Sequence, residues 1–159
     1  MRIQKGKLLL YSILICQGTG ILGSFFTTSS VNGWYLTLNK PSFNPPSWLF
    51  APVWTILFLL MGISMYLVWL KVEKNKQAQK AFWLFLLHLL VNIGWSALFF
   101  GLKRPDFALV GILFLWAFIA RLVFLFGQIN KKAGWLLVPY WAWVSFASLL
   151  NFYLYKFNL

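Results

Sequence analysis

Long apolar runs separated by short polar clusters dominate this chain. Five runs qualify as membrane spans, at about 8–26, 48–70, 81–101, 106–127 and 134–155. Each approaches the roughly 20 residues that a helix needs to cross the hydrocarbon core of a bilayer. The runs are too long for the ~10-residue strands of a membrane barrel, and they lack the alternation of those strands. The pattern predicts an all-α integral membrane protein, in which residues 1–159 form one domain with a bundle of five transmembrane helices.

The composition agrees with a chain whose solvent is lipid. Hydrophobic residues make up 61% of the 159 positions and charged residues only 10%, against about 25% charged in soluble proteins. The formal net charge is +12, but the basic residues fall in the breaks between apolar runs, so no nucleic-acid partner is expected. The chain has one cysteine, Cys16, which allows no internal disulfide and no cysteine-based metal site. Its two acidic residues, Glu73 and Asp106, argue against paired-carboxylate chemistry and carboxylate-bridged metals.

The distribution of basic residues predicts the orientation. Five spans place nine basic residues on the side of the N-terminus: Arg2, Lys5, Lys7, Lys71, Lys74, Lys76, Lys80, Lys131 and Lys132. Four lie on the other side: Lys40, Lys103, Arg104 and Lys156. The positive-inside rule then puts the N-terminus in the cytoplasm, with the first loop and the C-terminus outside. The alternative that the first run is a cleaved signal peptide is weaker, because the run exceeds the usual 7–15 apolar residues.

The first connector, from Thr27 to Ser47, is longer than the others and rich in aromatic residues and proline. Each proline fixes its own φ and biases the preceding residue away from helix. We therefore expect a stiff, extended lid over one end of the bundle. Tyr35, Lys40 and Pro45 are its candidate ligand contacts. The alternative is that these aromatics form an interfacial belt at headgroup depth.

Several spans carry aromatic residues beside small or amide residues. Trp54 lies inside the second span, and Asn92 and Trp95 are close together on the third. On the fifth, the spacing predicts one helical face for four residues: Tyr140, Trp143, Ala147 and Asn151. Taken singly, these faces are typical of helix packing, because a buried amide must find partners. Together with a lid, they favour a pocket for a flat hydrophobic molecule.

The single histidine, His88, lies inside the third span. A lone intramembrane histidine most often forms a hydrogen bond with a neighbouring helix, and no second histidine offers a paired haem ligand. Asp106 lies beyond the end of the same helix, so a hydrolytic triad is implausible. Proton-coupled transport usually places an acidic residue within a span. Here Asp106 lies at the very end of the fourth span and Glu73 lies between spans, so no acidic residue is inside one.

Three sequence blocks carry a resemblance to a known family. The first is the pattern W-Y-x-x-L-x-K-P-S-F-x-P-P-x-W-x-x-x-P-V-W-T at residues 34–55. The second is N-I-G-W-S with F-F-G at residues 92–101, and the third is P-Y-W-A-W-V-S-F-A with L-N at residues 139–151. Together they resemble the TspO/MBR family of tryptophan-rich sensory proteins and translocator proteins, also called the peripheral-type benzodiazepine receptor family.

The resemblance implies a five-helix protein, usually a homodimer, here expected in a bacterial cell membrane. It implies protoporphyrin IX or another flat hydrophobic molecule as ligand and membrane lipid as partner, with no cofactor required and no metal. The tryptophans matching Trp54 and Trp143 are implied as catalytic in light- and oxygen-dependent porphyrin degradation. The binding residues expected from the faces, the lid and the resemblance are Tyr35, Lys40, Pro45, Trp54, Asn92, Trp95, Tyr140, Trp143, Ala147 and Asn151.

Two positions depart from the family pattern. His88 stands where many members have Gln, and Phe107 where a Trp is common. The sequence is also compatible with two other functions. One is a small transporter of porphyrin or other hydrophobic ligands, although such proteins usually carry ionisable coupling residues. The other is an assembly subunit whose polar faces only pack.

Overall fold

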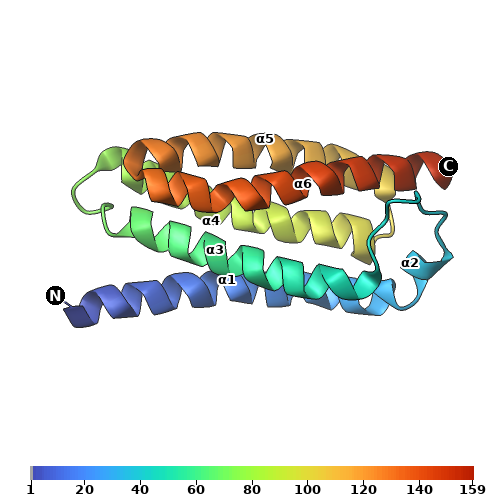
Figure 1. Ribbon diagram of the computed structural model, residues 1–159, viewed down its shortest axis with the longest axis horizontal. Helices are drawn as coiled ribbons and strands as arrows, with labels where there is room; N and C mark the ends of the chain where they lie inside the picture. Colours follow the sequence, from blue (N-terminus) through green and yellow to red (C-terminus); the bar gives the residue numbers. More distant parts are fainter. Residues whose placement is uncertain (1) are drawn as a thin grey trace.

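The structure is a computed structural model that describes residues 2–159, and it is an all-helical bundle (Figure 1). Five of its helices are long and apolar enough to cross a membrane, which confirms the predicted fold class. The long helices are α1 (Arg2–Val31), α3 (Phe50–Trp69), α4 (Lys76–Ser96), α5 (Pro105–Ile129) and α6 (Lys131–Phe157). Shorter elements are α2 (Trp34–Thr37), the 3-10 turn η1 (Ser47–Leu49) and the π-helical turn η2 (Ala97–Gly101) that extends α4.

The connections after α3, η2 and α5 are short, as predicted, and their residues begin the next helix. Asn75 caps α4, because its side chain accepts hydrogen bonds from the backbone N–H groups of the first turn. Asn130 caps α6 in the same way. Pro105 is the first residue of α5, where the N–H that proline lacks would have no helical partner. Because these connections are short, successive helices are antiparallel neighbours.

The first connector differs from the expected extended lid. Helix α1 continues to Val31, and residues 34–37 form the helical turn α2, so the irregular part spans only residues 38–46. The prediction of an extended chain is therefore wrong for the first half of this segment. The hydroxyls of Thr27 and Thr28 donate to carbonyls four residues earlier, at 3.2 and 2.7 Å, which lets hydroxyl residues continue a helix in place of ending it.

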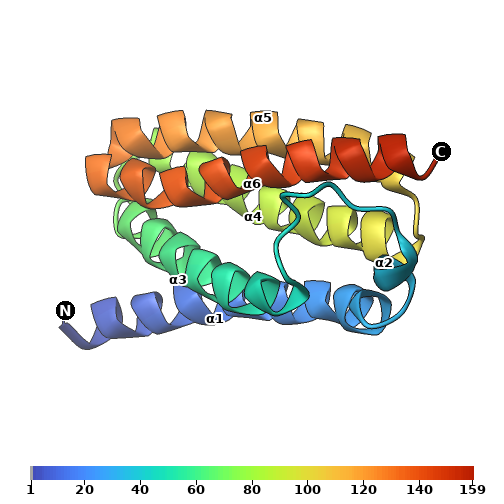
Figure 2. The same cartoon turned by 45° about the vertical axis from the view of Figure 1, so that its right-hand side comes forward.

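Glycines set how closely the helices approach. A Cβ on Gly62 of α3 would lie 2.9 Å from the Cα of Ile13 on α1, and one on Gly134 of α6 would lie 2.7 Å from the Cα of Gly127 on α5. Figure 2 shows α5 and α6 side by side and α3 crossing α1. Gly101 faces the Phe26 ring of α1, and a Cβ at this position would lie 3.0 Å from that ring.

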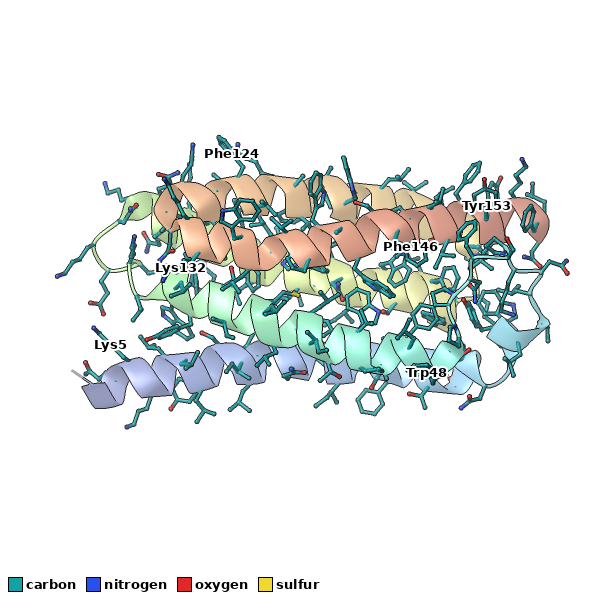
Figure 3. All side chains as sticks on the ribbon, viewed as in Figure 1. Lys5, Trp48, Phe124, Lys132, Phe146 and Tyr153 are labelled. Atoms are coloured by element: carbon teal, nitrogen blue, oxygen red, sulfur yellow. The ribbon has the colours of Figure 1, made fainter. Side chains whose placement is uncertain are left out.

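The two ends of the bundle differ in their charged residues. The α3–α4 and α5–α6 connections lie at the same end as the N-terminus, and Figure 3 places Lys5 and Lys132 there. Trp48 and Tyr153 mark the opposite end, with the first connector and the C-terminus. The helices thus group the basic residues as the sequence predicts. The side of the membrane that each end faces stays a prediction.

Candidate functional site

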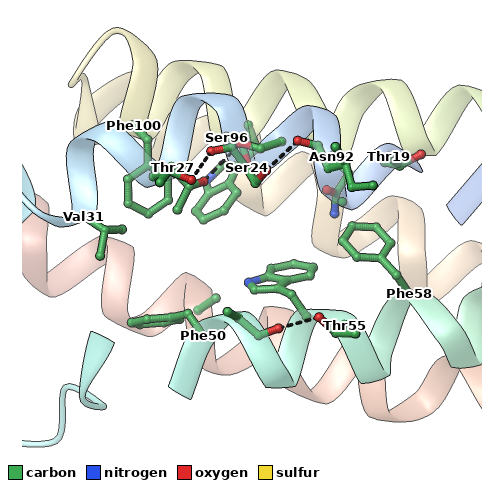
Figure 4. A pocket seen from close by; sticks show the side chains of 18 of the residues that line it. Thr19, Ser24, Thr27, Val31, Phe50, Thr55, Phe58, Asn92, Ser96 and Phe100 are labelled. Atoms are coloured by element: carbon green, nitrogen blue, oxygen red, sulfur yellow. Dashed lines mark hydrogen bonds between the residues drawn. The ribbon is translucent and has the colours of Figure 1, made fainter. Parts of the chain in front are cut away.

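A cavity of about 400 Å³ lies near the end of the bundle that carries the first connector. Helices α1 and α3 form its two long walls, α4 with η2 closes the back, and α6 contributes two residues (Figure 4). Its size falls within the ~300–1,000 Å³ usual for small-molecule sites. Among the described residues, none from α5 lines the cavity, so the long helices that form it are α1, α3, α4 and α6.

The α1 wall is built from glycine and hydroxyl residues. Each hydroxyl donates to a carbonyl of its own helix, at 3.0 Å for Thr19, 2.6 Å for Ser24 and 3.2 Å for Thr27. Their oxygens keep lone pairs that can accept a further hydrogen bond. Gly20 and Gly23 leave α1 without side chains on the same stretch, so Phe58 of the opposite wall lies close to Gly20, and Ser96 of α4 lies close to Gly23. This wall offers a ligand acceptor oxygens and a nearly flat helix surface.

The opposite wall is aromatic. Phe50, Trp54 and Phe58 follow one another at four-residue spacing on α3, so they share one face of the helix. Trp54 lies 5.5 Å from Phe58, and Phe50 lies 6.1 Å from Trp143 of α6, measured between ring centroids. Trp95 and Phe100 add two rings from α4 and η2. A planar apolar ligand would find stacking and edge contacts along this wall.

One buried side-chain nitrogen beside the cavity has no partner within the described chain. The indole nitrogen Nε1 of Trp143 is buried and donates no hydrogen bond, although Trp143 lines the cavity. The nitrogen of Trp141 and the hydroxyl of Ser12 are also unpartnered, but neither residue lines the cavity. A buried donor without an acceptor costs free energy, and because the protein encloses this nitrogen, Trp143 presents its ring and not its N–H to the cavity.

A hydrogen-bonded chain of side chains leads from the cavity into the core. Asn92 lines the cavity, and its Nδ2 donates to the Tyr140 hydroxyl at 2.8 Å. That hydroxyl lies 3.1 Å from Nε2 of His88, and Nδ1 of His88 lies 2.8 Å from the Phe85 carbonyl oxygen. His88 therefore bonds to a neighbouring helix, as the sequence suggests. Tyr140 is buried behind Trp54, with ring centroids 6.1 Å apart, and does not line the cavity.

Asn151 ties helices together and does not face the cavity. Its Oδ1 accepts from the indole Nε1 of Trp95 at 3.3 Å, and its Nδ2 donates to the Pro105 carbonyl at 2.9 Å. The residue is 1% exposed. Asn151 thus links α6 to α4 and to the first residue of α5, and it fixes the orientation of a tryptophan that does line the cavity.

The first connector is fastened at several points above the cavity. Tyr35 lines the cavity, and its hydroxyl donates to Oδ1 of Asn44 at 2.8 Å. Burial raises the pKa of the Tyr35 phenol, and the bond to Asn44 acts in the opposite direction. The Lys40 ammonium lies 4.9 Å from the Tyr35 ring centroid and donates to the Leu36 and Leu38 carbonyls. Lys40 therefore lies above the rim, outside the lining.

The far part of the connector is joined to the end of α6. The Asn39 backbone N–H donates to Oδ1 of Asn158, and Nδ2 of Asn158 donates back to the Asn39 carbonyl, both at 2.9 Å. The Phe43 ring packs against Tyr153 at 5.4 Å between centroids. Pro45 accepts a bond from Asn44 through its carbonyl and does not line the cavity. These contacts make the connector a fastened cover.

The cavity opens sideways between α1 and α3. Ile21, Ala51 and Thr55 line it and are also exposed on the outer surface of the bundle, Ile21 by 61%. At the deep end of this opening, Nε2 of Gln17 donates to the Thr55 carbonyl at 3.0 Å and joins the two helices. Because these positions belong to membrane-spanning helices, the opening faces lipid.

Six of the ten expected binding residues line the cavity: Tyr35, Trp54, Asn92, Trp95, Trp143 and Ala147. The other four, Lys40, Pro45, Tyr140 and Asn151, lie above it or behind it. The sequence interpretation missed Phe50, Phe58 and the α1 wall, although the spacing of Phe50, Trp54 and Phe58 could have revealed the α3 face. Phe107 is 55% exposed beside the Arg104 guanidinium and lies outside the cavity.

The fold and the site together define a class: integral membrane proteins with five spanning helices and an aromatic cavity beneath a fastened connector. The TspO/MBR family profile matches residues 12–156, and the chain belongs to this family. It is 46% identical over 144 residues to the tryptophan-rich protein TspO of Chlorobaculum tepidum, covering 91% of each chain. It is 44% identical to the protein of the same name from Archaeoglobus fulgidus, covering 94% of this chain and 96% of that one. The translocator protein of Bos taurus is 34% identical, with 87% and 83% covered.

Proposed function

We propose that this protein binds protoporphyrin IX or a similar flat hydrophobic molecule in the cavity. We also propose that Trp54 and Trp143 support its light- and oxygen-dependent degradation. The observation that carries the binding proposal is the contrast between the two walls, one of aromatic rings and one of glycines and hydroxyls. A ligand that is planar and apolar but has polar groups along one edge matches both walls at once.

The lipid-facing opening supports a ligand that dissolves in the membrane. A tetrapyrrole partitions into the hydrocarbon region, and the side opening between α1 and α3 allows part of a large ring to extend beyond the walls. Lys40 supplies a cation above the rim, where the propionates of a porphyrin would reach the headgroup region.

The chemistry proposed for the tryptophans is electron donation. A porphyrin excited by light takes one electron from a neighbouring indole, leaving a tryptophan radical cation and a porphyrin radical anion. The anion passes its electron to dissolved oxygen, which forms superoxide beside the ring, and this superoxide is the oxidant proposed to degrade the porphyrin. Indole is well suited to this role, because it is more easily oxidised than a phenyl ring. Trp54 and Trp143 line the cavity from different helices, so either can lie beside the ring.

Transport of the ligand is the alternative, and the shape of the cavity favours binding. Its lining reaches no deeper than Gln17 on α1 and Phe58 on α3. Beyond that level, Gly62 lies against the backbone of Ile13, so the two walls meet. A transporter needs a route to the opposite face, and this contact closes the path between α1 and α3.

We further propose that the protein is a homodimer in a bacterial cell membrane, with its N-terminus in the cytoplasm and its first connector outside. The separation of basic residues between the two ends of the bundle supports this orientation. Chemical labelling of single cysteines introduced at Lys5 and Lys156, in the Cys16→Ser background, tests the orientation in intact cells. Labelling of the Lys5 position by an impermeant reagent would reverse the assignment.

A spectral titration with protoporphyrin IX in lipid nanodiscs, in the dark and under illumination, tests the function. We expect saturable binding in the dark and oxygen-dependent loss of the porphyrin bands in the light. Trp143→Phe keeps most of the ring area, so it should retain much of the affinity and slow the loss. Unchanged degradation in both Trp143→Phe and Trp54→Phe would reject the electron-donor role, and no saturable binding would reject the function itself.

A further inference from the structure

The hydrogen bonds around Tyr140 define a direction for its proton. The Phe85 carbonyl can only accept, so Nδ1 of His88 carries a hydrogen and donates to it. The amide of Asn92 donates to the Tyr140 oxygen. The phenolic hydrogen then has one acceptor left, the bare Nε2 of His88 at 3.1 Å. An imidazolium would leave that hydrogen without an acceptor and bury a charge among the helices, so His88 is neutral here.

This arrangement pairs a phenol with a base directly behind a tryptophan of the cavity. The Trp54 and Tyr140 ring centroids lie 6.1 Å apart, close enough for electron transfer between neighbouring rings. The tyrosine, the histidine and the asparagine are 1%, 0% and 4% exposed, so water does not compete for the proton. Tyr35 offers a contrast within the same cavity, because its hydroxyl donates to an amide oxygen, which is not a base.

We propose that Tyr140 and His88 form a relay that returns an electron to Trp54 after its oxidation; this inference rests on the electron-donor role proposed above. The Trp54 radical cation takes one electron from Tyr140, and the phenolic proton moves along the hydrogen bond to Nε2 of His88. The products are neutral Trp54, a neutral tyrosyl radical and an imidazolium at His88. One electron and one proton move, and the total charge inside the bundle is unchanged.

Two kinds of contact reduce the cost of the buried imidazolium that forms at His88. Its Nδ1–H already donates to a carbonyl, a bond that strengthens when the ring is charged. The rings of Phe85 and Phe118 lie 4.9 and 6.0 Å from the His88 ring between centroids, within the range of cation–π attraction. Asn92 continues to donate to the oxygen of the tyrosyl radical. The relay therefore replaces a positive indole with a positive imidazole that donates a hydrogen bond to the Phe85 carbonyl.

Electron paramagnetic resonance of the full-length protein in nanodiscs, frozen after illumination, tests the relay. One arm uses bound protoporphyrin IX as oxidant. The second uses a membrane-soluble ruthenium polypyridyl photo-oxidant with a sacrificial acceptor, which oxidises indoles without any ligand in the cavity. We expect a tyrosyl radical that is lost in Tyr140→Phe and in His88→Gln, whose amide can accept a hydrogen bond but not the proton. Tyr66 lies outside the cavity lining, so the control variant Tyr66→Phe should keep the tyrosyl radical signal.

Two further readouts separate a relay from a purely structural role. Formation of the radical should slow in deuterated buffer, because a proton moves with the electron. Oxidation products at Trp54, measured by peptide mass spectrometry, should accumulate faster in Tyr140→Phe than in the wild type. Failure of protoporphyrin IX to bind would refute the proposed function while the ruthenium arm still tests the relay. Identical radical spectra for the wild type and Tyr140→Phe in the ruthenium arm would overturn the relay.

Discussion

Replacing Gly62 by alanine should push α1 away from α3 at the point where the two walls of the cavity meet. The added Cβ would lie 2.9 Å from the Cα of Ile13 and 3.2 Å from the Ser12 carbonyl oxygen. Carbon atoms in contact lie about 3.5–4.0 Å apart, so the backbones must separate by roughly 0.6 Å or more. Both obstacles are backbone atoms, which cannot rotate aside as the end of a side chain can.

The cost of this overpacking is about 1–3 kcal/mol. Alanine recovers part of it, because glycine inside a helix is less favourable by about 0.5–1 kcal/mol. We therefore predict that Gly62→Ala lowers the free energy of unfolding by about 1–2 kcal/mol. Equilibrium unfolding in mixed micelles, followed by far-ultraviolet circular dichroism as the denaturing detergent is increased, measures the difference.

Gly18 provides the matched control, since it lies on the same pair of helices and a Cβ there meets nothing within 4 Å. Gly18→Ala should be neutral or stabilising by up to about 1 kcal/mol. An equal effect of the two substitutions, or a stabilised Gly62→Ala, would refute the reasoning that backbone contact at Gly62 sets the distance between α1 and α3.

Three other predictions concern the cavity and its cover. Ala147→Leu should weaken protoporphyrin IX binding by about 1–3 kcal/mol by filling the cavity; unchanged affinity by fluorescence titration would exclude Ala147 from the contact surface. Lys40→Gln should weaken protoporphyrin IX more than its neutral dimethyl ester, with a difference that shrinks in high salt; equal losses for both would remove the ammonium from recognition. Asn158→Ala removes two hydrogen bonds to Asn39, together worth about 1–2 kcal/mol, so hydrogen exchange in residues 38–46 should rise about tenfold; unchanged exchange would mean that other contacts hold the connector.

The sequence was informative where one property decided the outcome. Run length and hydropathy predicted the spans, because a bilayer imposes a length on every helix that crosses it. Trp54 and Trp143 could be singled out because each lies deeper than an interfacial residue should. In both cases the prediction depends on position along one helix and needs no knowledge of how the helices are rotated.

The α1 wall was not predicted, because Ser and Thr usually indicate a turn or a loop. Away from water, the hydroxyls of Thr27 and Thr28 bond within the helix, and the residues that mark a loop in a soluble chain become part of a span. Tyr140 and Asn151 were correctly placed on one face with Trp143. Whether that face meets a ligand or another helix depends on the rotation of α6 against α4, which spacing within one helix does not define.

The sideways opening of the cavity changes what an affinity means for this protein. A ligand that reaches Trp54 between α1 and α3 is drawn from the bilayer, so its effective concentration is a mole fraction among lipids. Adding lipid at constant ligand dilutes that phase and lowers occupancy, although neither the protein nor its contacts have changed. Dissociation constants from preparations with different lipid contents become comparable only after the ligand is counted per lipid in place of per litre.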